Sequence, residues 1–306
     1  MLSSCRVLDL TDDRGDLAGH LLAQLGAEVI AVEPPEGSAS RRLGPFAGDR
    51  PDPEGSLRHW AYNRGKRSLR LDRCDLAALV ATADVVIESG AIAVDLEAWR
   101  AADPGLITVS ISAFGSDGPK AAWAADDLTI AAACGQAVLT GDADRAPLRI
   151  SEPQAFLHAG ADAAVAVLAA LAERERSGLG QHLDVSAQQS FMAATQFHML
   201  AAAVGAPMGR RLSGGQRIGP YELRFVYRTL DGHVSILFLF GDMIGRFTQR
   251  LMAWVHEAGY CSDELAAQDY VSFFEELFSG RLDPSVLADA TSAVAAFTDR
   301  KSTRLN

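Results

Sequence analysis

In QAFLHAGADAAVAVLAALAERERSGLGQHLDVS, residues 154–186, the sequence predicts a long helix that leads through a glycine turn into a short strand. Pro153 suits a first helical position, where a missing N–H costs nothing, and no proline follows over about six turns. Alanine and glycine occur on every face of this helix, which predicts burial on all sides. Gly178 and Gly180 end the helix, and QHLDVS follows as the strand. A helix that leads back into a strand indicates an α/β sheet.

The segments before this helix repeat the alternation of strand and helix. Strands are predicted at 6–10, 27–32, 68–71, 84–88 and 106–112, and helices at 17–25, 75–83 and 94–101. Because the strands are nearly continuous apolar runs, we predict a mainly parallel, Rossmann-like sheet with helices on both faces, in one large domain over residues 1–204. Glu33 resembles the acidic residue of a dinucleotide fold. Gly15 and Gly19 do not form GxGxxG, however, which argues against an NAD site.

The pattern changes after residue 204. Residues 205–220, rich in glycine and arginine, are predicted to be a linker. Residues 221–299 are predicted to form a smaller α+β domain, with a hairpin of 221–228 and 233–240 around Asp231 and Gly232 and helices near 242–257, 263–279 and 284–297. The last residues, 300–306 (RKSTRLN), break every earlier pattern and are predicted to be a non-native tail.

The composition excludes several function classes. A hydrophobic fraction of 48% with 22% charged residues is ordinary for a globular protein, and a net charge of −11 argues against a nucleic-acid partner. The four cysteines are far apart and form no CxxC, so neither a disulfide framework nor a metal site is predicted. Charged residues interrupt the longest apolar runs, and no signal peptide opens the chain, so we predict a cytoplasmic protein without a membrane span that acts on a small molecule.

Four blocks carry a resemblance to the family III CoA-transferases of the CaiB/BaiF type, the group of formyl-CoA transferase, carnitine CoA-transferase and α-methylacyl-CoA racemase. They are VLDLTDDRGDLAGHLLAQLGAEVIAVEPP from Val7, NRGKRSLRLD from Asn63, SISAFGSDGP from Ser110 and ERERSGLGQHLDVS from Glu173. The resemblance implies a Rossmann-like large domain, CoA transfer between an acyl-CoA and a carboxylic acid, no tightly bound cofactor, and an interlocked homodimer when full length. It also implies that this chain is divergent and truncated at its C-terminus.

The resemblance breaks at the position of the catalytic nucleophile. The family places an aspartate in the first turn of the central helix, where the helix N-terminus favours a carboxylate that can attack a thioester. Phe156 stands at that position here, and a phenyl ring cannot attack. The racemase branch uses a histidine followed by an aspartate, and Asp126 and Asp127 stand there. These two carboxylates are weak catalytic candidates, with a helix N-cap as the other interpretation. His158 lies about 200° round the helix from Phe156, so we do not expect it to replace the nucleophile.

The family's CoA contacts are only partly retained. By resemblance they fall on residues after the first, third and fourth strands, which are Asp13, Arg14, Leu71, Asp72, Arg73 and Ser89. Pro34 replaces the basic residue usual after Glu33. Cations that are predicted to be able to face phosphates are Arg41, Arg42, Arg64, Lys66, Arg67 and Lys120, although Lys66 and Arg67 suit a charged surface equally well.

Two functions are compatible with these residues. The chain is either a divergent CoA-transferase that acts on an acyl-CoA with other groups, or a catalytically silent homologue. A silent homologue would be an inactive half or partner of a larger transferase that keeps CoA binding or an assembly role. Phe156 favours the silent homologue, whereas the retained NRGKRS and SGLGQHLDVS blocks favour the enzyme weakly, since both blocks also serve the fold.

Overall fold

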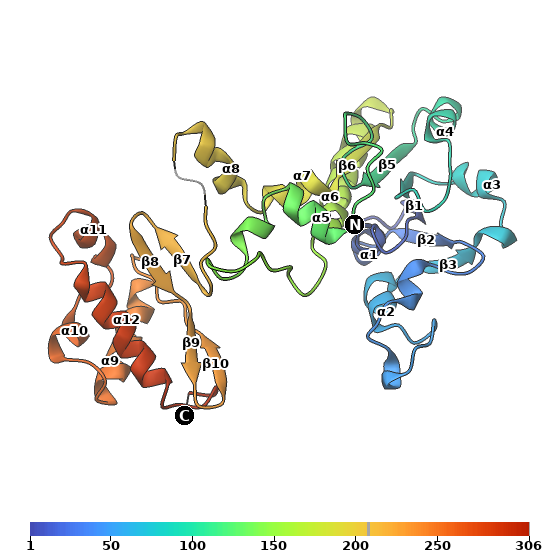
Figure 1. The fold of residues 1–306 in the computed structure, drawn as a ribbon. Coiled ribbons are helices and arrows are strands. Elements are labelled where there is room, and N and C mark those ends of the chain that lie inside the picture. Colours follow the sequence, from blue (N-terminus) through green and yellow to red (C-terminus); the bar gives the residue numbers. More distant parts are fainter. Residues whose placement is uncertain (207–208, 306) are drawn as a thin grey trace. The chain divides into compact units, whose positions relative to one another are not determined.

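The computed structural model describes residues 1–206 and 209–305, and the chain divides into two compact units (Figure 1). The first unit comprises Met1–Thr140 and Ala146–Arg210, and the second comprises Gly141–Arg145 and the residues from Arg211 onward. The division falls inside the predicted linker 205–220, whose residues 207 and 208 lie outside the described part of the chain, as does Asn306 of the predicted tail.

The first unit is built on a six-stranded sheet in the order β3-β2-β1-β4-β5-β6, and every neighbouring pair is parallel. Its strands are β1 (Arg6–Leu10), β2 (Glu28–Glu33), β3 (Arg67–Arg70), β4 (Val85–Glu88), β5 (Ile107–Ser112) and β6 (His182–Ser186). The predicted α/β class with a parallel sheet is therefore confirmed. The predicted strand bounds differ from the observed ones by a few residues at most.

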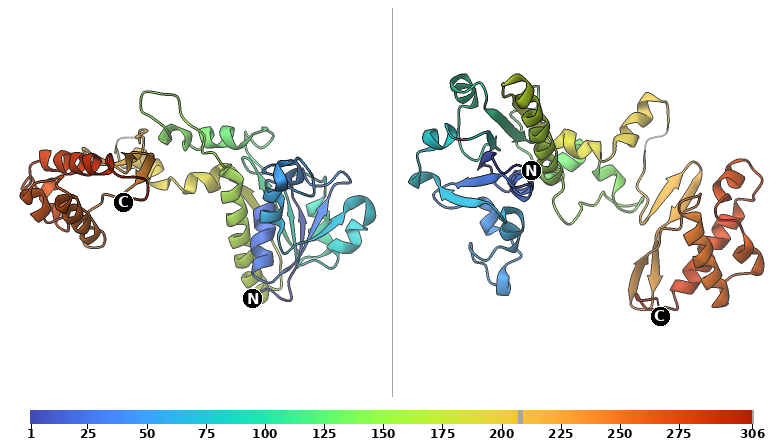
Figure 2. Two further views of the ribbon diagram at one scale, coloured as in Figure 1. Left: turned by 90° about the horizontal axis from the view of Figure 1, so that it is seen from below. Right: turned by 180° about the vertical axis from the view of Figure 1, so that it is seen from behind.

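Helices cover both faces of this sheet (Figure 2). One face packs against α1 (Asp16–Gln24), α6 (Ala155–Ser177) and α7 (Ala187–Ala193). The other face packs against α3 (Leu76–Val80) and α4 (Leu96–Ala102) through residues such as Leu8, Leu10 and Val86. The remaining helices of the unit are α2 (Leu57–Asn63), α5 (Asp127–Ala133) and α8 (Gln196–Ala203), with 3₁₀ turns η1 (Ala39–Arg42), η2 (Ala47–Asp49), η3 (Leu71–Arg73) and η4 (Ala137–Leu139).

Helix α6 is buried along one side, so the prediction that it is buried on all sides is wrong for this chain. The side that faces the sheet and α1 is closed, with Gly160 and Ala163 fully covered. The opposite side is open, because Val165 is 66% exposed and Ala169 and Ala172 are also exposed. Alanine suits both environments, so composition did not distinguish the two sides. Helix α6 is also long and apolar enough to cross a membrane, as core helices of soluble proteins can be, so the absence of a membrane span stays a prediction.

Gly160 lets α1 and α6 approach closely. A Cβ atom at this position would lie 3.0 Å from the Cβ of Leu17 and 3.2 Å from the backbone nitrogen of Ala18. Carbon atoms in contact normally lie about 3.5–4.0 Å apart, so any side chain here would push α1 away. The glycine therefore fixes the distance between the two helices.

The described residues of the second unit form two antiparallel strand pairs and four helices. The strands are β7 (Gly215–Ile218), β8 (Tyr221–Arg224), β9 (Val226–Thr229) and β10 (Gly232–Ser235), and the helices are α9 (Gly245–Glu257), α10 (Asp263–Ala267), α11 (Phe273–Phe278) and α12 (Ser285–Thr298). Here the predicted long hairpin is corrected. The segment 221–228 is divided between two strands, and the second arm ends at Ser235. The turn comprises Leu230 and Asp231, because Thr229 pairs with Gly232.

Aromatic side chains form the core of the second unit. Tyr227, Phe238, Tyr270, Phe273 and Phe297 are fully buried. The predicted tail contacts the β9–β10 turn, where the backbone N–H of Thr303 donates to Asp231 Oδ1 at 2.6 Å and the Leu230 N–H donates to the Lys301 carbonyl at 2.8 Å. Its foreign origin stays a prediction.

Candidate functional site

The first turn of α6 lies at the carboxyl end of the parallel sheet, where open α/β sheets bind their ligands. The C-terminus of α6 is fixed beside the start of β5, since the Gly180 N–H donates to the Pro104 carbonyl at 2.8 Å and Arg174 donates to the Gly105 carbonyl. Because the helix runs antiparallel to the strands, its N-terminus lies at their opposite ends. The loops that follow β1, β4 and β5 also begin at the carboxyl end of the sheet.

Phe156 is the second residue of α6, and its side chain is half-buried against the apolar core of the sheet. The N-cap residue, Gln154, makes no side-chain cap. His158 stacks on Phe191 with ring centroids 5.2 Å apart. A hydrocarbon group therefore occupies the position where a nucleophilic carboxylate was expected.

Asp127 places its carboxylate at the N-terminus of α6. Its Oδ1 accepts the backbone N–H groups of Gln154 at 2.6 Å and Ala155 at 2.8 Å, although it belongs to α5. The helix dipole and the otherwise unpaired N–H groups favour this negative charge. Asp127 therefore caps α6 from a neighbouring helix, a contact that was not predicted from the sequence.

Asp126 is the N-cap of α5. Its Oδ1 accepts the Thr129 N–H at 2.8 Å and the Thr129 hydroxyl at 2.7 Å. The backbone hydrogen bond from Thr129, followed by the hydroxyl, lowers the pKa of Asp126. The two adjacent carboxylates thus cap two different helices and do not form an acid–base pair with each other. Their catalytic role stays a prediction.

The loop after β1 brings two of the predicted CoA-binding residues together. Arg14 donates from Nε and Nη2 to the Asp12 carboxylate at 2.8–3.0 Å, and the hydroxyl of Ser89, after β4, donates to Asp12 Oδ1 at 3.0 Å. Asp12, which we did not predict, joins the two loops. Burial, followed by repulsion from Asp12, raises the pKa of Asp13. Burial and the negative charge of Asp12 therefore oppose ionisation of Asp13. The two acids also make this loop a poor binding site for an anion.

The other predicted CoA contacts lie apart from this loop. Leu71, Asp72 and Arg73 form η3 after β3, which is separated from β1 by β2. Asp72 pairs with Arg70 at 3.0 Å, and Leu71 packs into the apolar core. Among the described residues, no hydrogen bond or ion pair joins η3 to Arg14 or Ser89.

A pocket of about 860 Å³ opens beside β4. Its lining includes Glu88, Asp95 and Glu97, with Arg100 as its cation. The volume suits a large cofactor, but three acids facing one arginine oppose the phosphates of CoA. This surface therefore adds no support for phosphate binding.

Three of the six predicted phosphate-facing cations, Arg41, Lys66 and Arg67, already have acidic partners. The Lys66 side chain is 1% exposed and its ammonium donates to Asp9 Oδ2 at 2.7 Å, so the prediction of Lys66 as a surface or phosphate-facing group is wrong. Arg41 donates to Glu33 at 2.6 Å, and Arg67 pairs with Glu28 at 2.8 Å. Arg42 donates to the carbonyl of Glu36 at 2.7 Å.

Lys66 belongs to a buried polar network of α1, α2 and β1. Its ammonium donates to the Asp16 carbonyl at 2.8 Å, and Asn63 donates to Asp16 Oδ2 at 3.0 Å. Burial, together with the nearby Asp9, raises the pKa of Asp16 to about 7 against the opposing effect of Lys66. The NRGKRS block therefore serves the fold through Asn63 and Lys66.

No group of three or more metal-ligating side chains occurs within residues 1–206 and 209–305. All four cysteines are free thiols, and burial raises the pKa of Cys5 to about 11.

Comparisons with known proteins cover the first unit and part of the second. The family described as CoA-transferase family III matches residues 2–270. The chain is 36% identical to the succinate–glutarate CoA-transferase of Agrobacterium fabrum, over 77% of this chain and 62% of that protein. It is 32% identical to the succinyl-CoA:(R)-benzylsuccinate CoA-transferase subunit BbsE of Thauera aromatica, over 84% of this chain and 64% of that protein. The chain thus spans less than two thirds of the length of these relatives.

A solved structure supports the same assignment. The CAIB/BAIF family protein from Brucella suis superposes with a TM-score of 0.75 at 28% identity, over 99% of this chain and 79% of that chain.

Proposed function

This chain belongs to CoA-transferase family III, and we propose that it binds an acyl-CoA and takes part in CoA transfer to a carboxylic acid without supplying the nucleophilic carboxylate itself. In the reaction that the family implies, a carboxylate attacks the thioester carbon, expels the CoA thiolate and forms a mixed anhydride. The thiolate then attacks the enzyme's carbonyl carbon in the anhydride and expels the donor acid as a carboxylate, which leaves the enzyme carboxyl group as a CoA thioester. The acceptor carboxylate attacks this thioester, expels the thiolate and forms a second mixed anhydride. The thiolate finally attacks the acceptor's carbonyl carbon, which gives the new acyl-CoA and restores the enzyme carboxylate. Every covalent step needs that carboxylate.

The observation that carries this proposal is the side chain of Phe156. It lies in the first turn of α6 and packs against apolar residues. The neighbouring carboxylates already have structural roles, since Asp127 caps α6 and Asp126 caps α5. A partner chain with a carboxylate at the equivalent position would complete the reaction. The relative from Thauera aromatica is named as a subunit, which supports an assembly of more than one kind of chain.

The substrates that we propose are an acyl-CoA and a free carboxylic acid, with no tightly bound cofactor. Relatives named for succinate, glutarate and benzylsuccinate support a dicarboxylic acid among them. We further propose a cytoplasmic protein that works as a dimer, with neither nucleic acid nor a membrane as a partner. Four free thiols and a net charge of −11 support this environment.

The test combines CoA binding with an acyl-transfer assay on the full-length protein. We expect saturable CoA binding by calorimetry and no CoA transfer from succinyl-CoA to free acids by the protein alone. Transfer should appear when a family III chain with an aspartate at the position of Phe156 is added. Robust transfer by the protein alone would refute the claim that this chain supplies no nucleophilic carboxylate. A lack of CoA binding would refute the proposal as a whole.

A further inference from the structure

The loop that joins β1 to α1, residues 11–15, is held at both of its ends by one buried ion pair. Asp9, in β1, and Lys66, just before β3, have side chains that are 2% and 1% exposed. Asp9 Oδ1 accepts the Thr11 N–H at 3.1 Å and the Thr11 hydroxyl at 2.6 Å. The Lys66 ammonium donates to Asp9 Oδ2 at 2.7 Å and to the Asp16 carbonyl at 2.8 Å. The ion pair therefore connects the first residue of the loop to the first residue of the helix that follows it.

The loop is also narrow. Gly15 passes so close to Thr11 that a Cβ atom at Gly15 would collide with the Thr11 side chain. The Gly15 N–H donates to the Asp12 carbonyl at 3.0 Å, which closes the turn between them. Asp13 and Arg14 lie within this turn, so a displacement of Thr11 would move both of them.

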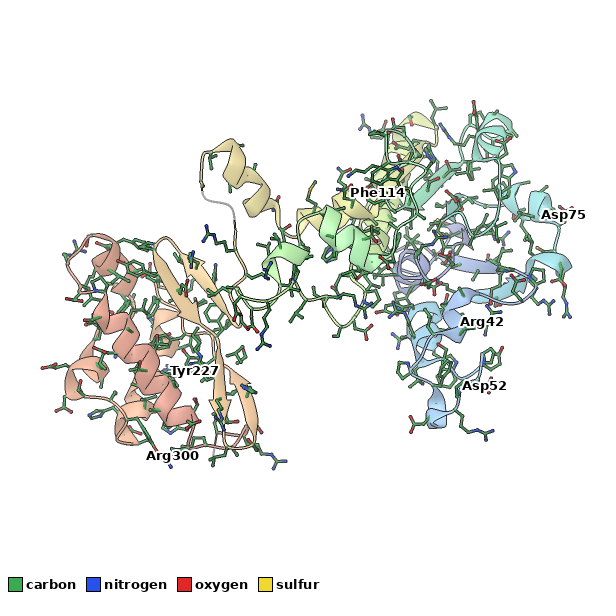
Figure 3. All side chains as sticks on the ribbon, in the orientation of Figure 1. Arg42, Asp52, Asp75, Phe114, Tyr227 and Arg300 are labelled. Carbon is green, nitrogen blue, oxygen red and sulfur yellow. The ribbon has the colours of Figure 1, made fainter. Side chains whose placement is uncertain are left out.

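Helix α2 and the turn η1 hold the ion pair in place from the other side. Asn63, in α2, donates to Asp16 Oδ2 at 3.0 Å, and its Nδ2 lies 3.1 Å from His59 Nδ1. The same His59 nitrogen lies 2.7 Å from the hydroxyl of Ser40 in η1, the turn that ends at Arg42, which is labelled in Figure 3. The ion pair is therefore connected to α2 and η1 as well as to the loop.

The shape of this loop matters because Asp13 and Arg14 are two of the CoA contacts predicted from the resemblance. The acids Asp12 and Asp13 oppose phosphates, so the loop gains little from a general attraction to an anion. CoA also carries N–H and O–H groups, from which carboxylates accept hydrogen bonds. Such hydrogen bonds weaken steeply when donor and acceptor are poorly aligned. The contribution of the loop to CoA binding would therefore depend on its exact position.

We propose that the ion pair of Lys66 and Asp9 positions the loop after β1 for CoA binding, through Thr11 at one end and the Asp16 carbonyl at the other. Both side chains of the pair are buried, so they are positioning residues and do not touch CoA themselves. This inference rests on the proposed function, because it names the groups that keep a CoA-binding loop in its bound shape.

The test removes the two contacts separately in the full-length protein and titrates CoA calorimetrically. Thr11→Val has nearly the same shape and leaves the ion pair intact, but it removes the hydroxyl that donates to Asp9. We expect it to weaken CoA binding about fivefold, because only part of the molecules then hold the loop in its bound shape. Lys66→Met removes the ammonium from both ends of the loop and should weaken CoA binding about tenfold or more. Hydrogen exchange of the peptide that contains residues 11–15, followed by mass spectrometry without CoA, should be faster in both variants.

Asp84 offers a matched control at the opposite end of the sheet. Like Asp9, it accepts from a cation and from a backbone N–H, since Arg174 donates to its Oδ1 at 2.9 Å and the Arg6 N–H donates to its Oδ2 at 2.8 Å. It lies just before β4, at the amino ends of the parallel strands. Asp84→Asn should therefore keep CoA binding within about twofold of the wild type. All titrations are made at a temperature at which circular dichroism shows each variant folded.

Unchanged CoA affinity in Thr11→Val would overturn the inference, whether or not the loop exchanges faster. An equal loss of affinity in Asp84→Asn would also overturn it, because the effect would then follow from stability alone. If Lys66→Met does not fold, Thr11→Val decides the matter. Failure of the proposed function appears separately, as a lack of CoA binding by the wild type.

Discussion

Replacing Gly160 by leucine should test the close contact between α1 and α6. The first added carbon would lie 3.0 Å from Leu17 Cβ and 3.2 Å from the backbone nitrogen of Ala18, and three further carbons would follow. Overpacking of this kind costs about 3 kcal/mol at the upper end of its usual range. Replacing glycine in a helix interior returns about 1 kcal/mol. We therefore expect a net loss of about 2 kcal/mol.

In a unit of about 200 residues, that loss corresponds to a decrease in Tm of about 4–8 °C. Ala169→Leu is the matched control, because it adds a leucine to the exposed side of the same helix and should change stability by at most about 0.5 kcal/mol. Thermal unfolding followed by circular dichroism measures both variants. A wild-type Tm for Gly160→Leu, or an equal decrease for Ala169→Leu, would refute a helix packed along one side.

Three further predictions concern the buried network and the first turn of α6. Asp9→Asn removes the closer of the two carboxylates beside the buried Lys66 ammonium and leaves only Asp16, at 3.8 Å. The change should cost about 3 kcal/mol, measured as a lower urea midpoint, and a wild-type midpoint would contradict the ion pair. The pKa of Asp16, raised to about 7, means that the folded state holds a proton that the unfolded state releases above about pH 4. The contribution of protonated Asp16 to stability is therefore present below about pH 4 and lost as the pH rises to about 7. Asp16→Asn should make the decline of the urea midpoint between pH 5 and 7 less steep. An unchanged slope would count against the raised pKa. Phe156→Asp should not by itself yield a trapped CoA adduct, because catalysis also needs positioning within about 1 Å, and mass spectrometry that detected an adduct in this variant would show that the groove has kept its geometry.

The sheet was predictable because its signals are local. The apolar runs of β1, β4 and β5 and the glycines after α6 identify strands and a helix end without any distant contact. The alternation of the two element types then specifies a parallel sheet. In the second unit the same local signals predicted a hairpin around Asp231, but they made both of its arms too long and displaced the turn by one residue. The pairing of Thr229 with Gly232 depends on contacts between the strands, which local signals do not specify.

The site was less predictable because its contacts join residues far apart in the sequence. From the sequence alone, Lys66 is interpreted equally well as a surface charge, because its partner Asp9 is 57 residues away in the chain and comes beside it only in the fold. The sequence indicates a local N-cap at Asp126 or Asp127. In the structure the Asp127 carboxylate instead accepts a hydrogen bond from the first turn of a helix 28 residues further along the chain. The exposed side of α6 also escaped prediction, because alanine carries little information about burial. Phe156 was identifiable only through the resemblance, which supplies the expected carboxylate.

The most direct measurement of the central claim is a trapping experiment on the unmutated, full-length protein with succinyl-CoA. The protein is treated with hydroxylamine or borohydride and mapped by peptide mass spectrometry. We predict no acyl or CoA adduct on any carboxylate, and an unmodified peptide around Phe156. A covalent adduct together with robust CoA transfer would contradict the claim. The position of that adduct, for example at Asp126, Asp127 or Glu152, would identify the carboxylate that performs the reaction.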